Sequence, residues 1–239
     1  MWKQLLIVAA SLGAVGLAVY LLAARAPSAP SGALRLATPA ERAQSLPREQ
    51  AAERLRTLQV ESASRMPDDV RGVHLGLSRV ELARLRPQAQ QGRGAMPGQV
   101  VYQEALANGA VVAYLISARI DRVAQVQFLS RLRDPALLVE HYRALRVRYG
   151  EPSFFFDCPR NGDTAPTRRI VWLGREVAVM EAVLAHPGGV SLTLAVAGNS
   201  DVLGAMRANG CAPVTRERFA DWPIASEVRG ERVPVPAPR

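Results

Sequence analysis

An uncharged apolar run near the amino terminus is the longest such stretch of the chain. Leu5–Ala24 spans twenty residues without a charge. At about 1.5 Å of rise per residue, a helix of this length crosses the roughly 30 Å apolar core of a bilayer. Trp2 and Tyr20 are aromatic residues suited to the two membrane interfaces. The pattern predicts a transmembrane helix within a membrane-anchor region of residues 1–26.

A cleavable signal peptide is the alternative interpretation of this run. It requires an apolar region of about 7 to 15 residues followed by a small-x-small site. The best such triplet, residues 24–26, is followed by Pro27, which fits poorly where a peptidase binds its substrate in extended form. We therefore favour an uncleaved signal anchor. A short cytoplasmic amino terminus and an exported body are expected, because long domains translocate largely regardless of flanking charge.

Residues 27–69 change to a Pro-, Ala- and Arg-rich composition that predicts a linker with a helical stalk. Pro27–Gly32 cannot continue the membrane helix. A helical stretch that begins with Ser45 and Pro47 is predicted to run to about Ser62, with Leu55 and Leu58 on one side and charges on the other. A solvated stalk is the favoured interpretation, and a short partner-binding helix is the alternative.

The folded body is expected to begin at Val70. Gly72–Leu77 has the pattern of a short strand, and Ser78 with Glu81 forms a capping box at the start of a brief helix. Leu77 and Leu82 flank this box as a hydrophobic staple.

The helix ends at Pro87, and Gln88–Gly98 is predicted to be a flexible loop. Asn108-Gly109 is the strongest hairpin signal of the chain. The three predicted strands are Gln99–Ala107, Ala110–Ala118 and Arg119–Leu129. In the third, one face holds Ala124, Val126 and Phe128, and the other holds Val123, Gln125 and Gln127.

A helix followed by strands comes again in residues 134–213. Apolar residues recur at helical spacing from Asp134-Pro135 to Gly150, at Leu138, Tyr142, Leu145 and Tyr149. The strands that follow are Phe154–Phe156, Arg168–Leu173, Glu176–Ala185 and Val190–Ala197, and a last helix is expected at Asp201–Ala208.

The predicted fold class is therefore α+β: one amino-terminal transmembrane helix, then two helix-plus-antiparallel-meander repeats, residues 70–133 and 134–213. Residues 214–239 are rich in Pro and predict an extended or disordered tail.

The charge distribution of the chain argues against one class of partner, nucleic acids. The net charge of +9 comes almost entirely from arginine, since Lys3 is the only lysine, and acidic residues offset it along the whole chain. A charge so diffuse argues against nucleic-acid binding, although attraction to anionic lipid headgroups remains compatible with it. We find no phosphate loop, dinucleotide fingerprint or serine elbow, and no cofactor is expected.

Two cysteines, Cys158 and Cys211, form an even set in a chain expected to reach an oxidising compartment. We predict a disulfide between them, which would close a loop of about fifty residues and stabilise the fold by about 4 kcal/mol. A reactive or metal-binding thiol pair is disfavoured, because neither cysteine lies in a C-x-x-C and no histidine stands at ligand spacing.

The positions of the three histidines in the sequence do not indicate a catalytic site. His141 falls on the helical face of Leu138 and Leu145, where packing is the simpler interpretation, and His74 and His186 belong to a short strand and a turn. Cys158, His141 and Asp157 could be assembled into a catalytic constellation, but nothing in their spacing favours it.

The densest positive charge lies around the second long helix, at Arg131, Arg133, Arg143, Arg146 and Arg148. A solvated helix face is the simplest interpretation. Contact of Arg143, Arg146 and Arg148 with an anion or lipid headgroup is the sharper one. Trp172 is expected in the core, and Trp222 either packs back onto the body or anchors a partner.

Two short motifs carry a resemblance. GVHLGLSRVEL at Gly72–Leu82 and RYGEP at Arg148–Pro152 resemble motifs of the SmpA/OmlA family of small outer-membrane assembly lipoproteins. The matching positions are Gly72, Gly76, Ser78, Glu81, Gly150 and Pro152. The tandem order of helix and meander is also similar to the fold of β-lactamase inhibitor proteins. The resemblance implies a protein-binding scaffold and carries over no catalytic residue.

Two functions follow from this pattern. The first is a non-catalytic periplasmic module, held in the bacterial inner membrane by one helix, that binds other envelope or inner-membrane proteins as a scaffold or accessory subunit. The alternative is an envelope enzyme with a site in the loops 88–98 and 158–167. We favour the first, because caps, turns and strand exteriors already account for the polar residues.

Overall fold

A computed structural model describes residues 48–92, 98–134, 136–159, 167–186 and 189–215. The expected membrane helix Leu5–Ala24, with Trp2 and Tyr20, lies outside these residues, as does Trp222 in the expected tail. In the part of the chain that is described, no helix has both the length and the apolar character needed to cross a bilayer.

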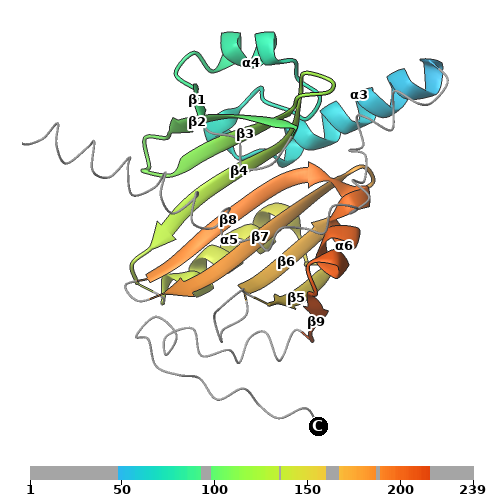
Figure 1. The fold of residues 1–239 in the computed structure, drawn as a ribbon. Helices are drawn as coiled ribbons and strands as arrows, with labels where there is room; N and C mark the ends of the chain where they lie inside the picture. The colour runs from blue at the N-terminus through green and yellow to red at the C-terminus, as the bar shows by residue number, and fades with distance from the viewer. Residues whose placement is uncertain (1–47, 93–97, 135, 160–166, 187–188, 216–239) are drawn as a thin grey trace, which may run out of the picture.

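The described chain is α+β and forms one antiparallel sheet of nine strands (Figure 1). The strand order is β1-β2-β3-β4-β8-β7-β6-β5-β9. The strands are β1 (Gln90–Gly92), β2 (Gln99–Ala105), β3 (Val111–Ser117), β4 (Arg122–Leu132), β5 (Phe154–Cys158), β6 (Thr167–Leu173), β7 (Val177–His186), β8 (Gly189–Gly198) and β9 (Ala212–Pro213). The helices are α3 (Arg48–Arg65), the 3₁₀ turn η1 (Asp68–Val70), α4 (Arg79–Leu85), α5 (Leu137–Tyr149) and α6 (Asn199–Ala208).

The main core lies on one side of the sheet, which we call the helix-covered face. Strand alternation directs Tyr114, Val126, Val179 and Val196 to this side, where they pack with residues of α3, α4 and α5. A smaller cluster lies on the opposite side, where Val202 and Met206 of α6 pack on β5 to β7. Figure 1 shows α5 behind the strands and α6 beside β5 and β6.

Several predicted elements are confirmed. The strands of the hairpin flank Asn108-Gly109, where Gly109 has a φ of +82° and the Ala110 amide donates to Asn108 Oδ1 at 2.9 Å. Helix α5 ends at Gly150 with a φ of +81°, as its sequence predicts. Trp172 is buried in the core, and its indole donates to the Gly150 carbonyl at 2.9 Å.

The segment Gly72–Leu77 is not a strand, contrary to the prediction. Gly72 and Gly76 both have a positive φ, +87° and +83°, which breaks the extended conformation. Its backbone forms two hydrogen bonds with Val123 of β4, beside the isolated bridge between Ser78 and Arg122, and the Arg122 side chain donates to the Gly76 carbonyl at 2.7 Å. The capping box at Ser78 is confirmed, with Leu77 and Leu82 both buried next to it.

We expect Ser78→Ala to lower the free energy of unfolding by about 1 kcal/mol. Ser78 Oγ accepts the Glu81 amide at 3.2 Å and the Glu81 carboxylate accepts the Ser78 amide at 2.9 Å, so alanine removes an acceptor from the helix start. Urea unfolding measures the change, with Arg84→Ala on the exposed side of α4 as the control. Equal loss in the two variants would contradict the assigned cap.

Strand β4 departs from simple alternation. Its pairing with β3 shifts between Leu115 and Ile116, which face Gln125 and Val123, so Ala124 is the extra residue of a bulge. The bulge brings Val123 to the same side as Val126, and both are fully buried. The predicted separation of Val123 from Val126 onto opposite faces is therefore wrong.

Helix α3 is part of the body, and the expectation of a solvated stalk is wrong for it. Leu58 lies in the main core, and the buried Ser62 Oγ accepts the Leu75 amide at 2.9 Å. The Glu61 carboxylate accepts the Arg175 and Glu176 amides at 3.0 and 2.8 Å. The charged side of α3 therefore binds the β6–β7 turn, a contact distant in sequence that periodicity cannot reveal.

Two short strands were missed. The predicted loop 88–98 contains β1, which pairs with the middle of β2. Strand β9 pairs with Phe156 and Asp157 of β5. Two or three residues are too few for alternation to be seen in a sequence.

Candidate functional site

A buried carboxylate lies beneath α5. Glu181 occupies an inward position of β7 between Val179 and Val183, and it is 1% exposed. Its Oε1 lies 3.1 Å from Nε2 of His141, which reaches it from α5. Burial raises the pKa of Glu181, while the hydrogen bond and charge of His141 oppose the shift.

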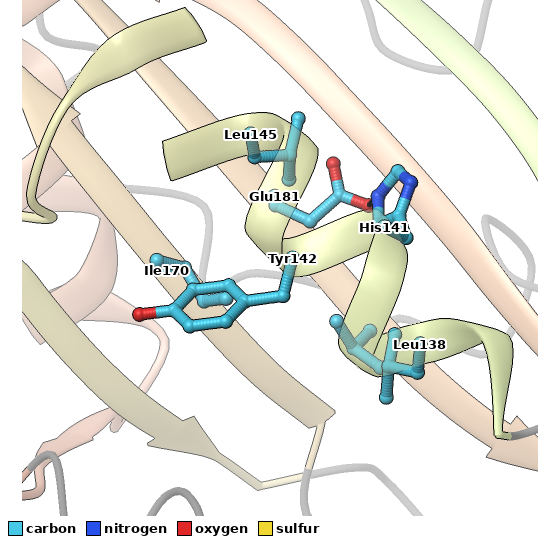
Figure 2. Close-up of a pocket in the computed structure, with 7 residues that line it drawn as sticks. Leu138, His141, Tyr142, Leu145, Ile170 and Glu181 are labelled. Carbon is cyan, nitrogen blue, oxygen red and sulfur yellow. Dashed lines mark hydrogen bonds and ion pairs between the residues drawn. The ribbon is translucent and has the colours of Figure 1, made fainter. Parts of the chain in front are cut away.

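The cavity beside this pair is about 30 Å³ in volume. Figure 2 shows the pair under the turn of α5, with Tyr142 and Ile170 nearby. The lining residues are Leu138, His141, Tyr142, Leu145, Ile170, Glu181 and Val183. Such a volume holds one water, and among the described residues Glu181 Oε2 and the Tyr142 hydroxyl find no hydrogen-bond partner.

Carboxylate and imidazole together are a typical pair for general acid–base chemistry. Here Glu181 is enclosed by the sheet and α5, and the cavity beside it is too small for a substrate. The side chain of His141 is 28% exposed, so its outer edge meets solvent. We interpret the pair as the polar link between α5 and β7.

A second buried polar cluster lies near the other end of the helix-covered face. Glu104 of β2 accepts the hydroxyl of Tyr114 and, at 2.6 Å, the Nε of Arg86. Burial, together with the hydrogen bond to Glu104, raises the pKa of Tyr114. Arg86 also donates to the Asp69 carbonyl at 3.2 Å. This cluster joins the end of α4 to β2 and β3.

The three arginines predicted to contact an anion have different environments. Arg146 pairs with Glu151 and lies 6.0 Å from the centre of the Tyr142 ring. Arg148 donates to the Met66 carbonyl next to α3. Arg143 is exposed and has no ion-pair partner within the described part of the chain. Two of the three therefore already have partners within the protein, and an anion contact stays a prediction that rests on Arg143.

Arg131 and Arg133 lie elsewhere, at the end of β4. With Ser130 they border a surface hollow of about 260 Å³, whose other wall is the turn Asn108–Ala110. The five arginines that are close in sequence thus belong to two separate surfaces.

Cys158 and Cys211 form the predicted disulfide, which links the end of β5 to the short connection between α6 and β9. The constellation of Cys158, His141 and Asp157 is therefore not formed as a catalytic group: the cysteine has no thiol, and the histidine faces Glu181. Asp157 Oδ1 instead lies 3.6 Å from the buried Arg168.

The other histidines are not brought together with His141. His74 is half-buried with Nδ1 3.0 Å from the Leu75 carbonyl, and the backbone of His186 pairs with Gly189 at the end of β7. The described residues contain no group of three side chains able to hold a metal ion. Of the proposed enzyme loops, residues 93–97 and 160–166 lie outside the description.

The side of β2, β3, β4 and β8 that faces away from α5 carries no described helix, and we call it the open face. Polar and aliphatic side chains alternate over it; the glutamines, Ser191 and Thr193 are half-buried, and Val101, Ala113 and Leu115 form a small buried cluster. Its residues include Gln99, Val101, Gln103, Ala113, Leu115, Gln125, Gln127, Leu129, Ser191, Thr193 and Ala195. The β4–β8 pairing makes it continuous, because Gln127 lies opposite Ala195 and Leu129 opposite Thr193.

Sequence alternation identified the two glutamines of β4 as lying on one side. It did not identify the open face, because nothing local indicates that β4 pairs with β8, whose residues lie 58 to 72 positions after their partners in β4. Neither a protein-family model, nor a curated protein, nor a solved structure matches this chain.

Proposed function

We propose that this chain is a non-catalytic interaction module of the bacterial cell envelope, which binds other envelope or inner-membrane proteins through its open face. The observation that carries the proposal is the continuous alternation of Gln, Ser and Thr with Val, Leu and Ala over four strands that no described helix covers. Amide and hydroxyl groups beside aliphatic ones suit an interface that must also be soluble when unbound, since such interfaces resemble ordinary protein surface in polarity.

The placement of the charged groups supports a binding function over catalysis. The buried acids Glu104 and Glu181 are each engaged by a side chain of a neighbouring element, and Glu61 by backbone amides. These contacts attach helices to the sheet. An enzyme site would instead bring several such groups to one accessible cleft.

The proposed location in the cell rests on two features. Leu5–Ala24 has the length and composition of a single inner-membrane anchor, and the body would then lie in the periplasm. The Cys158–Cys211 disulfide is consistent with this, because such bonds persist in oxidising compartments. We also propose that α4 with β1–β4 and α5 with β5–β8 are two repeats of one unit, in line with the resemblance to protein-binding scaffolds.

The test is a pull-down of the tagged full-length chain from crosslinked native membranes, read by mass spectrometry. The variant Gln127→Arg/Thr193→Arg places two cations at the centre of the open face, and Val60→Arg on the exposed side of α3 is the matched control. We expect a partner in near-stoichiometric amount with the wild type and the control, and at least tenfold less with the double variant. Equal recovery by all three, or no partner with the wild type, would contradict the proposal.

A further inference from the structure

Strand β4 extends beyond its neighbour β3 at one end of the sheet. The last residue of β4 that pairs with β3 is Leu129, opposite Val111, whereas pairing with β8 continues to Leu132. Among the described residues, 130–132 therefore have a neighbouring strand on one side only. A free edge of this kind presents backbone amides and carbonyls to which a further strand can be added.

The surface hollow of about 260 Å³ lies against this free edge. Ser130, Arg131 and Arg133 form its β4 side, and residues 108–110, the turn that leads into β3, form the other. Because pairing with β3 stops at Val111, the turn leaves this part of β4 uncovered. The hollow is therefore the place that a short extended segment would occupy beside residues 130–132.

The lining of the hollow is positively charged. It contains Arg131 and Arg133 and no Asp or Glu. Arg133 is exposed and makes no ion pair within the described part of the chain. The carboxylate of the next residue, Asp134, instead accepts the Ala136 amide at 2.9 Å, just before α5. The hollow is thus suited to a negatively charged group.

The spacing of the two arginines fits an extended ligand. They are two positions apart, and residues two apart in an extended chain project on the same side about 7 Å from each other. Carboxylates at alternate positions of an extended peptide have the same spacing, so each can reach one guanidinium. Arg131 also lies on the side of the open face, because it follows Gln127 and Leu129 at the period of the strand. The hollow and the open face are therefore continuous.

We propose that the end of β4 binds an acidic segment of a partner protein, which adds as a strand along residues 130–132 and places its carboxylates against Arg131 and Arg133. This inference rests on the proposed function and names the chemistry that the partner presents at one end of the open face. The residues that β2, β3, β4 and β8 direct to the open face include no Asp or Glu, which agrees with an acidic partner. Binding should weaken as salt is raised, because both arginines are close to solvent.

The test uses the full-length chain in micelles of an uncharged detergent. The probe is an acetylated pentapeptide amide in which glutamate alternates with valine, and the control peptide has glutamine in place of glutamate. Fluorescence anisotropy, with an uncharged fluorophore on each peptide, should show that the acidic peptide binds about tenfold more tightly or better. Hydrogen exchange of residues 130–132 should slow when this peptide is bound, because strand addition gives their amides new hydrogen bonds.

Charge reversal locates the binding site. Arg133→Glu should weaken binding of the acidic peptide about fivefold or more, because like charges then meet in the hollow. Arg143→Glu on α5 is the matched control, since it makes the same change at an exposed arginine outside the hollow, and it should bind within about twofold of the wild type. Arg131→Gln, a second variant, should weaken binding about threefold. Equal binding of the two peptides, or equal loss in Arg133→Glu and Arg143→Glu, would overturn the proposal.

Two further probes distinguish other sources of negative charge. Inorganic phosphate represents a free anion, and vesicles of phosphatidylglycerol represent a lipid surface. We expect neither to slow exchange at residues 130–132, and slowing by either of them without slowing by the peptide would overturn the proposal. The synthetic peptide requires no native partner. A partner in the pull-down without peptide binding would therefore contradict this inference alone, and peptide binding without a partner in the pull-down would contradict the function of the open face.

Discussion

Replacing both cysteines in Cys158→Ser/Cys211→Ser is expected to lower the free energy of unfolding by about 4 kcal/mol, the value that loop-closure entropy gives for a bond of this span. The cysteines are 53 residues apart in sequence. Without the bond, the unfolded chain gains freedom that the folded chain does not share. A loss of this size approaches the whole stability of many domains.

The effect should concentrate at one end of the sheet. Val202 and Met206 of α6 pack with both cysteines on a small cluster that includes Phe156 of β5, separate from the main core. Hydrogen exchange should therefore rise first in α6 and β9. Guanidinium unfolding followed by tryptophan fluorescence measures the total change, and reductant should affect the wild type but not the serine variant. A difference below about 1 kcal/mol would contradict the assigned contribution.

The buried pair beneath α5 gives the second large effect. His141→Ala leaves the Glu181 carboxyl enclosed without its partner, and we expect a loss of about 2 to 3 kcal/mol, below the usual cost for a fully buried pair because His141 is partly exposed. In the Glu181→Gln background the same histidine change should cost clearly less, because no charge is then buried. A double-mutant cycle at pH 8 measures this difference. Equal costs in both backgrounds would contradict it.

The same pair predicts a dependence on pH with a definite sign. Burial raises the pKa of Glu181, so the folded state binds this proton more tightly than the unfolded state does. Its favourable contribution is complete below the unfolded pKa, at about 4.3, and is lost as the pH rises through the folded pKa. Glu181→Gln should therefore match the wild type near pH 4 and exceed its stability by at least about 1 kcal/mol at pH 8. The opposite order at pH 8 would show that the ionised carboxylate is well stabilised.

Local signals in the sequence predicted the local structure well. The capping box at Ser78, the Asn108-Gly109 hairpin and the helix ending at Gly150 all rest on interactions within a few residues, and all are confirmed. The disulfide was predicted from the even count of cysteines together with the expectation of an oxidising compartment. In the first three cases the interacting residues are neighbours in the sequence. In the fourth, the chain has two cysteines, which can bond to each other.

What could not be predicted depends on contacts distant in sequence. From the sequence, Glu61 is expected to be a solvated helix residue. In the structure its carboxylate accepts two backbone amides of the β6–β7 turn. The bulge at Ala124 reverses the expected face of Val123 without any Gly or Pro to mark it. Glu181 lies in an alternating strand where a polar residue is expected to face water, and only α5 explains its burial. The open face depends on the β4–β8 pairing in the same way.

Site-specific photocrosslinking tests the binding function of the open face most directly. A photoreactive amino acid is placed in the full-length chain at Gln103, Gln127 or Thr193 on the open face, and at Val60 or Arg84 on exposed helix surfaces as controls. After irradiation in native membranes, we predict one discrete crosslinked protein shared by the three open-face positions and absent from both controls. No crosslink from any open-face position, or the same product from all five positions, would contradict the account.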